Sequence, residues 1–178
     1  MRIIRPGSSS RIHAAYPDLR LICVLRDPVA RAVSTARHLL QTGRVRSSTS
    51  LDALLVGEAL PMAEPHGVLP QGFHARHLRR YFALFGAERM WVLFYEDDLR
   101  DDPAGTLQPV CRFLGIGADF DFPDRLQRIN DPGFSRRALT LSYALPWLGR
   151  PIRAIDRRWA APYRPEASAG TRAVLERL

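Results

Sequence analysis

The sequence predicts an α/β fold built on a parallel sheet, and two observations carry that prediction. Two short apolar runs with strand character occupy residues 20–25 and 90–95. Each run is followed by an Asp-Pro pair that opens an amphipathic helical pattern. Strands that alternate with helices along a chain are typical of α/β proteins with parallel strands. With 178 residues, 46% of them hydrophobic, the chain is predicted to form a single domain spanning residues 1–178.

The first strand and helix are the clearest pair. Residues 20–25 contain β-branched side chains without polar alternation, which predicts a strand covered on both faces. Asp27 can cap the next helix, and Pro28 suits its first turn, where a missing N–H costs nothing. An apolar stripe at helical spacing then continues to a stop near Gly43, and it consists of Val29, Val33, Ala36 and Leu40.

The remaining elements follow in order. Residues 44–70 are polar and punctuated by Ser, Gly and Pro, which predicts a mobile surface excursion with one weak helical patch. A helix is expected over residues 72–85, a strand over 90–95, and a third helix from Asp102-Pro103 to Gly115. Weaker helical patterns occupy residues 137–148 and 171–178. Two strands are few for a parallel sheet, so further strands are expected outside this sequence.

The charge of the chain is strongly positive. The formal net charge is +8, and all 26 basic residues are arginine. A genome rich in G and C explains most of that bias and suggests a bacterial source, yet any site that needs a lysine is absent from this chain. Nine arginines lie between Arg125 and Arg164, which suits a polyanionic ligand, although solvated surface charge is the commoner cause of such a run.

Several classes of partner and location are not expected. The sequence has no run of 18 apolar residues and no apolar N-terminal leader, which predicts a cytoplasmic protein without a membrane span. No metal is expected, because the two cysteines have no tight grouping with histidines and the His74/His77 pair has no evident third ligand. No nucleic-acid partner is expected either, because no recognised nucleic-acid motif is present.

One constellation points to an anion site. Arg26 follows the first strand, at the sheet edge where α/β proteins bind ligands. The helix that begins at Pro28 offers free backbone N–H groups to the same place, where Ser34 and His38 share one helical face. Such a place suits a phosphate or sulfate. Alternatively, Arg26 pairs with an acid such as Asp27 or Asp98, and both helical residues are ordinary surface groups.

The stretch from Leu25 to Ser34 resembles the 3′-phosphate motif of sulfotransferases that use 3′-phosphoadenosine 5′-phosphosulfate (PAPS). That motif is a strand, an Arg-Asp/Asn-Pro turn and a helix bearing serine eight residues after the arginine. Further blocks resemble the family in order over residues 11–148, namely Gly72-Phe73, residues 91–99, Asp102-Pro103 and residues 113–115. The resemblance implies a three-layer αβα, P-loop-kinase-like fold. It also implies transfer of a sulfuryl group from PAPS to a hydroxyl or amine of a small-molecule or carbohydrate acceptor.

The resemblance assigns roles residue by residue. Arg26 and Ser34 match the family's 3′-phosphate ligands, and Arg136 and Arg137 resemble its later basic loop at the same phosphate. His38 matches a histidine near the acceptor and is the candidate catalytic residue. The implied co-substrate is PAPS, and the family needs no metal.

The sequence also departs from the family. The glycine-rich phosphosulfate loop with its lysine, and the base that follows it, have no counterpart here. The resemblance therefore implies a partial domain, truncated at its N-terminus, that lacks the first strand and the phosphate loop. Sulfuryl transfer by this chain alone stays open. The alternative is a non-catalytic or degenerate module that binds anionic ligands through its Arg-rich face.

Overall fold

A computed structural model describes residues 8–100, 102–117, 120–122, 134–159 and 163–178. The chain divides into two compact units, and each is described by itself. Unit 1 consists of residues 1–27 and 73–128, and unit 2 of residues 28–72 and 129–178. The prediction of one domain stays a prediction, because a division into units does not say whether they fold together.

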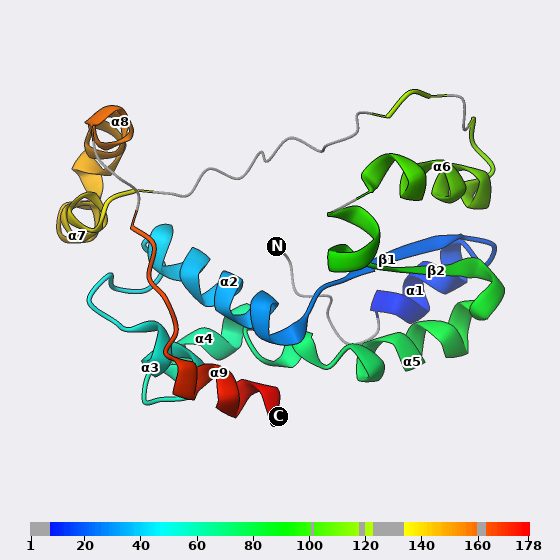
Figure 1. Ribbon diagram of the computed structural model, residues 1–178, viewed down its shortest axis with the longest axis horizontal. Coiled ribbons are helices and arrows are strands. Elements are labelled where there is room, and N and C mark those ends of the chain that lie inside the picture. The colour runs from blue at the N-terminus through cyan, green and yellow to red at the C-terminus, as the bar shows by residue number, and fades with distance from the viewer. Residues whose placement is uncertain (1–7, 101, 118–119, 123–133, 160–162) are drawn as a thin grey trace. The chain divides into compact units, whose positions relative to one another are not determined.

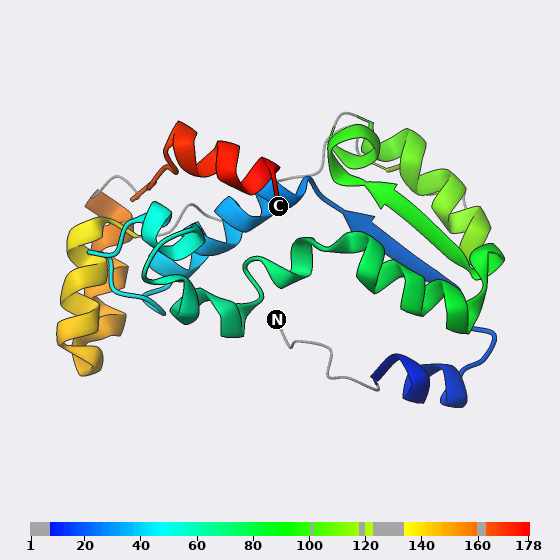
Figure 2. The same cartoon turned by 90° about the horizontal axis from the view of Figure 1, so that it is seen from below.

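Unit 1 is built around a parallel pair of strands. Strand β1 (Leu21–Leu25) pairs with β2 (Met90–Phe94), in a register that places Leu21 opposite Met90 and Leu25 opposite Phe94. Figures 1 and 2 show α5 (His74–Phe85) on one face of this sheet and α6 (Pro103–Leu114) on the other. Helix α1 (Ser8–Ala15) packs on α5, and short turns η3 (Ala87–Arg89) and η4 (Tyr95–Leu99) flank β2. The predicted α/β fold with parallel strands is confirmed.

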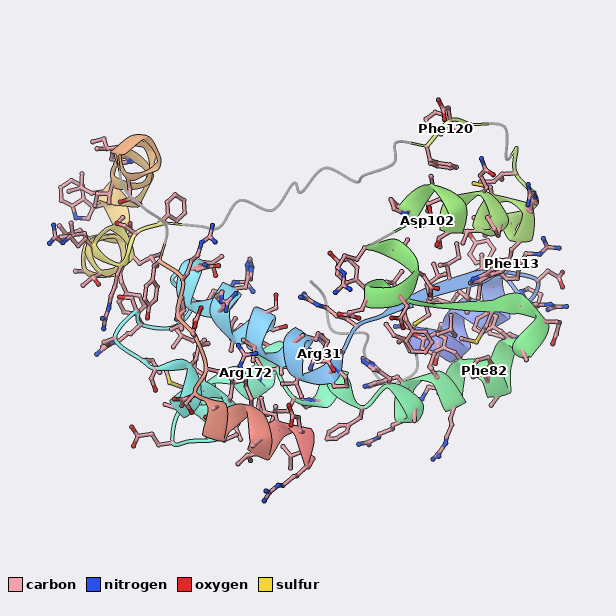
Figure 3. All side chains as sticks on the ribbon, in the orientation of Figure 1. Arg31, Phe82, Asp102, Phe113, Phe120 and Arg172 are labelled. Carbon is pink, nitrogen blue, oxygen red and sulfur yellow. The ribbon has the colours of Figure 1, made fainter. Side chains whose placement is uncertain are left out.

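The ends of α6 follow from its sequence. Asp102 caps the helix by accepting a hydrogen bond from the Gly105 amide at 2.8 Å, and Pro103 occupies the first turn. Gly115 ends the helix with φ of 72°, a left-handed conformation that favours glycine. Pro109 lies inside the helix, where it removes one intrahelical donor without ending it. Figure 3 places Asp102 at the start of the helix and Phe113 near its other end.

The cover of β1 differs from the prediction. Leu25 is buried, with 8% exposed, but Ile22 and Val24 on the opposite face of β1 are 39% and 50% exposed. Leu93, which pairs with Val24 on that face, is only 4% exposed. The expected strand covered on both faces is therefore wrong for these residues. Helix α6 packs over β2, where the Phe113 and Trp91 rings lie 5.3 Å apart, so it leaves part of β1 open.

Unit 2 is helical in its described residues. Helix α2 (Pro28–Gln41) packs against α3 (Leu51–Leu55) and α9 (Ala169–Glu176), and α7 (Arg136–Ala144) packs against α8 (Gly149–Trp159). The shorter pieces are α4 (Leu60–Ala63), η1 (Glu64–His66), η2 (Pro70–Gly72) and η5 (Pro146–Leu148). The predicted stripe of α2 faces the core, where Val33, Ala36 and Leu40 are buried and Val29 is partly buried.

Residues 44–70 differ from the predicted surface excursion. Three leucines of α3 at helical spacing, Leu51, Leu54 and Leu55, are buried in the core, together with Val45 and Val68. The segment is folded into helices of four and five residues, too short for a clear periodic signal in the sequence. A polar run over residues 46–50 precedes α3, which is why the composition indicated a loop. Its predicted mobility is not tested by this packing.

Within the described ranges, no helix is both long enough and apolar enough to cross a lipid bilayer.

Candidate functional site

Arg26 lies at the carboxyl end of β1, and only Arg26 and Asp27 separate this strand from α2. Its side chain is 42% exposed, with Nε 3.5 Å from Oε1 of Glu96. The guanidinium carbon lies 5.4 Å from the centre of the Tyr95 ring, a cation–π contact. Arg26 therefore pairs with an acid, as the alternative from the sequence allowed, but the acid is Glu96. Asp98 instead accepts a hydrogen bond from the Phe94 amide at 2.6 Å.

The peptide unit that joins Arg26 to Asp27 is held from both sides. Its N–H, on Asp27, donates to Oε2 of Glu96 at 3.2 Å. Its carbonyl, on Arg26, lies 2.8 Å from Nε2 of His74, and since a carbonyl only accepts, the histidine nitrogen donates. The chain leaves the sheet here, so side chains satisfy groups that the strand ladder no longer reaches.

Ser34 and His38 lie one turn apart on α2, in unit 2. Ser34 is half-buried and His38 is exposed, and both lie outside the buried stripe of the helix. The Thr42 hydroxyl donates to the backbone carbonyl of His38 at 2.7 Å. This bond does not involve the His38 imidazole. Arg26 belongs to unit 1, so its convergence with Ser34 on one phosphate stays a prediction.

Arg31, in the first two turns of α2, has a structural role that the sequence analysis did not single out (Figure 3). Its two terminal nitrogens donate to the carbonyls of Gly67 and Val68. A Cβ at Gly72 would lie 3.2 Å from the guanidinium, so the chain passes closely over it. Burial lowers the pKa of Arg31 from its ordinary value, because the charged form loses solvation. Arg31 thereby fastens residues 67–72 to the start of the helix.

The predicted basic loop lies at the start of α7, also in unit 2. Ser135 caps this helix, and its backbone N–H donates to Asp156 at 2.6 Å while its hydroxyl also bonds that carboxylate. Arg136 and Arg137 follow, and both are exposed. The Asp156 carboxylate already satisfies Ser135, so any anion at this loop would bind chiefly through the two arginines.

Two contacts tie Arg136 to the helix that carries Ser34 and His38. The Arg136 guanidinium lies 5.7 Å from the centre of the Tyr163 ring. The Tyr163 carbonyl accepts a hydrogen bond from Gln41, at the end of α2, at 2.8 Å. The structure thus brings the start of α7 to the end of α2 within unit 2. No contact of Arg137 contributes to this link.

The electrostatic character of the two units differs. The ion pairs found among the described side chains, Arg26–Glu96 and Arg89–Asp18, both lie in unit 1. Among the described residues, no ion pair with a carboxylate is found for the arginines of unit 2, which are Arg31, Arg37, Arg44, Arg46, Arg136, Arg137, Arg164, Arg172 and Arg177. Unpaired positive charge of this kind attracts anions.

Two side chains of types that bind metals, His74 and Asp102, have partners within the protein. Within the described part of the chain, no group of three or more His, Cys, Asp or Glu residues is placed to bind a metal ion. His74 bonds the Arg26 carbonyl, and Asp102 caps α6.

Sequence reasoning missed the residues that surround Arg26, namely Glu96, Tyr95 and His74. The signal for two of them was available. Tyr95 and Glu96 follow β2 directly, as Arg26 follows β1, and parallel neighbours end at the same sheet edge. His74 is tied to Arg26 across 48 residues by tertiary packing, for which the sequence carries no local signal.

Comparisons with known proteins agree on one family. The family model described as "Sulfotransferase family" matches residues 7–120. The chain is 34% identical over 107 residues to heparan sulfate glucosamine 3-O-sulfotransferase 6 of Homo sapiens, covering 60% of this chain and 30% of that protein. It is 25% identical over 126 residues to the human bifunctional heparan sulfate N-deacetylase/N-sulfotransferase 2, covering 68% of this chain and 14% of that protein.

A solved structure gives the same answer for the fold. The sulfotransferase from Alicyclobacillus acidocaldarius superposes with a TM-score of 0.57 at 28% identity, covering 85% of this chain and 58% of that one. The chain thus spans less than two thirds of each of these three relatives. The matched region contains β1, α2, α5, β2 and α6, together with Arg26, Ser34 and His38. The chain belongs to the sulfotransferase family.

Proposed function

We propose that this chain is part of a PAPS-dependent sulfotransferase that moves a sulfuryl group to a hydroxyl or amine of a carbohydrate. The observation that carries the proposal is Arg26, a half-exposed guanidinium at the carboxyl edge of the parallel strands, inside the region matched by the family. Ligands of α/β proteins bind at that edge, and a guanidinium fork suits phosphate.

The residues take the following roles in the proposal. Arg26 pairs with the 3′-phosphate of PAPS, Ser34 donates a hydrogen bond to it, and Arg136 and Arg137 add positive charge there. The acceptor oxygen or nitrogen attacks sulfur, the bond from sulfur to the bridging oxygen breaks, and 3′-phosphoadenosine 5′-phosphate (PAP) leaves. His38 lies toward the acceptor, whose proton must pass to a base.

The names of the relatives support a carbohydrate acceptor. Two of them are named for heparan sulfate, one as a glucosamine 3-O-sulfotransferase and the other as an N-deacetylase/N-sulfotransferase. Their names cover both an oxygen and a nitrogen acceptor. The unpaired arginines of unit 2 favour an acceptor that itself carries negative charge.

Calorimetric titration with PAP tests the proposal. We expect measurable binding, and Arg26→Ala to lose roughly 1.5–3 kcal/mol of binding free energy, as expected for a charge-assisted hydrogen bond. Arg89→Ala is the matched control, because Arg89 also forms an ion pair in unit 1, with Asp18 at 3.1 Å, but lies before β2. Equal affinity of the wild type and Arg26→Ala would contradict the role of Arg26.

A second candidate function is a non-catalytic module that binds anionic polymers through the arginines of unit 2. The absence of carboxylate partners for these described arginines favours it. A transfer assay with PAPS and a heparan-type acceptor separates the two candidates. Transfer that requires Arg26 supports the enzyme, whereas retention on immobilised heparin without transfer, lost as salt rises, supports the module.

A further inference from the structure

We propose that Glu96 and His74 are positioning residues that hold Arg26 in the orientation in which it binds the nucleotide phosphate. The inference rests on the proposed function, because it concerns the same phosphate. It goes beyond that function by assigning a role to two residues outside the 3′-phosphate motif.

The backbone at Arg26 is held by side chains from two other segments. Glu96 and His74 bind the two polar groups of a single peptide unit, the Asp27 N–H at 3.2 Å and the Arg26 carbonyl at 2.8 Å. A peptide unit held at both ends cannot rotate without breaking one bond, so the direction of the Arg26 side chain from the backbone is fixed. The two holding residues come from different elements, the turn after β2 and the first turn of α5.

The Arg26 side chain is contacted by two residues of the turn after β2. The other oxygen of Glu96 lies 3.5 Å from Nε of Arg26, and the Tyr95 ring lies under the guanidinium at 5.4 Å. Both contacts restrict the guanidinium, because the carboxylate attracts Nε and the ring face attracts the delocalised charge. Fixing a flexible arginine side chain costs rotamer entropy, so a ligand that meets an already ordered guanidinium binds at a smaller entropic cost.

The contact with Glu96 leaves the terminal nitrogens of Arg26 available for an anion in this proposal. Glu96 contacts the guanidinium at Nε, whereas the two terminal nitrogens lie at the other end of the fork. That end presents parallel N–H groups with the spacing of two phosphate oxygens. The carboxylate and the phosphate therefore contact opposite ends of one cation, and Glu96 need not leave when the nucleotide binds. A carboxylate that competed with the phosphate would have the opposite effect when removed.

A double-mutant cycle read by PAP calorimetry distinguishes positioning from competition. We expect Glu96→Ala and His74→Ala each to weaken PAP binding about threefold or more, and Glu96→Ala to add almost nothing in an Arg26→Ala background. Glu96→Gln, which keeps an oxygen acceptor for the Asp27 N–H, should recover part of the affinity. Asp97→Ala is the charge control, since Asp97 is the exposed neighbouring acid.

Each other outcome overturns a stated claim. Unchanged or tighter PAP binding by Glu96→Ala, with Arg26→Ala still weakened, overturns positioning and leaves the proposed function standing. Equal additional losses from Glu96→Ala in both backgrounds would show that it acts elsewhere than through Arg26. Absence of PAP binding by the wild type overturns the proposed function and this inference with it. Thermal unfolding of each variant confirms the fold, and Glu96→Gln replaces Glu96→Ala if the latter unfolds.

Discussion

At the scale of single residues, two arginines five positions apart have opposite environments. Arg26 keeps 42% of its side chain exposed at the end of β1, whereas Arg31 is half-buried and donates to two backbone carbonyls. Arg26 could be identified from the sequence, because it directly follows a predicted strand. Arg31 could not be identified in this way, because its partners lie 36 and 37 residues away in a segment that the sequence presents as a loop.

Arg31→Met should destabilise the protein by about 1–3 kcal/mol, because two buried carbonyls lose their donors. Arg31→Lys keeps the charge but loses the fork, so we expect a loss of similar size. Urea unfolding at neutral pH measures both variants. Arg44→Met is the control, since Arg44 is exposed in the same unit, and a loss as large for Arg44→Met as for Arg31→Met would contradict this role for Arg31.

At the scale of elements, helix ends that depend on local signals were predicted correctly, whereas short helices that depend on tertiary packing were not. The sequence predicts the starts of α2 and α6 from Asp-Pro pairs and the ends of α5 and α6 from glycines, and these bounds agree with the structure. Caps and breakers act within four residues, so a sequence reveals them. Short α3 and α4 were missed as core elements, because fewer than six residues cannot display a helical period.

Asp102→Ala should destabilise unit 1 by about 1 kcal/mol. The Asp102 carboxylate accepts a hydrogen bond from the Gly105 amide, and its negative charge interacts favourably with the positive end of the α6 dipole. Thermal unfolding followed by circular dichroism measures the loss. Asp97→Ala removes an exposed acid from the preceding turn and should change the midpoint little. The capping role fails if the two substitutions destabilise the protein equally.

At the scale of the whole molecule, the candidate site depends on contacts between segments far apart in the sequence. Glu96 reaches Asp27 across 69 residues, and Gln41 reaches Tyr163 across 122. The sequence identified Arg26, Ser34 and His38, which lie within one strand-turn-helix element, and it placed Arg136 and Arg137 in a separate loop. The sequence carried a signal for Glu96, which follows β2 as Arg26 follows β1, but none for His74, whose contact with Arg26 depends on the packing of α5.

The same long-range organisation makes unit 2 sensitive to acid through Asp52 on α3. The Ser168 N–H, at the start of α9, donates to Asp52 at 2.9 Å, and this backbone bond lowers the pKa of Asp52 from its ordinary value. A lowered pKa in the folded state means that the stabilisation is complete above about pH 4, where an unfolded aspartate is ionised, and is lost as pH falls through the folded value.

Asp52→Asn should therefore unfold at lower temperature than the wild type at pH 7, and the difference should shrink toward pH 3. Glu58→Gln, at an exposed acid in the same segment, is the control, and a gap for Asp52→Asn that stays constant from pH 7 to pH 3 would rule out a role for the Asp52 charge in holding α9 to α3.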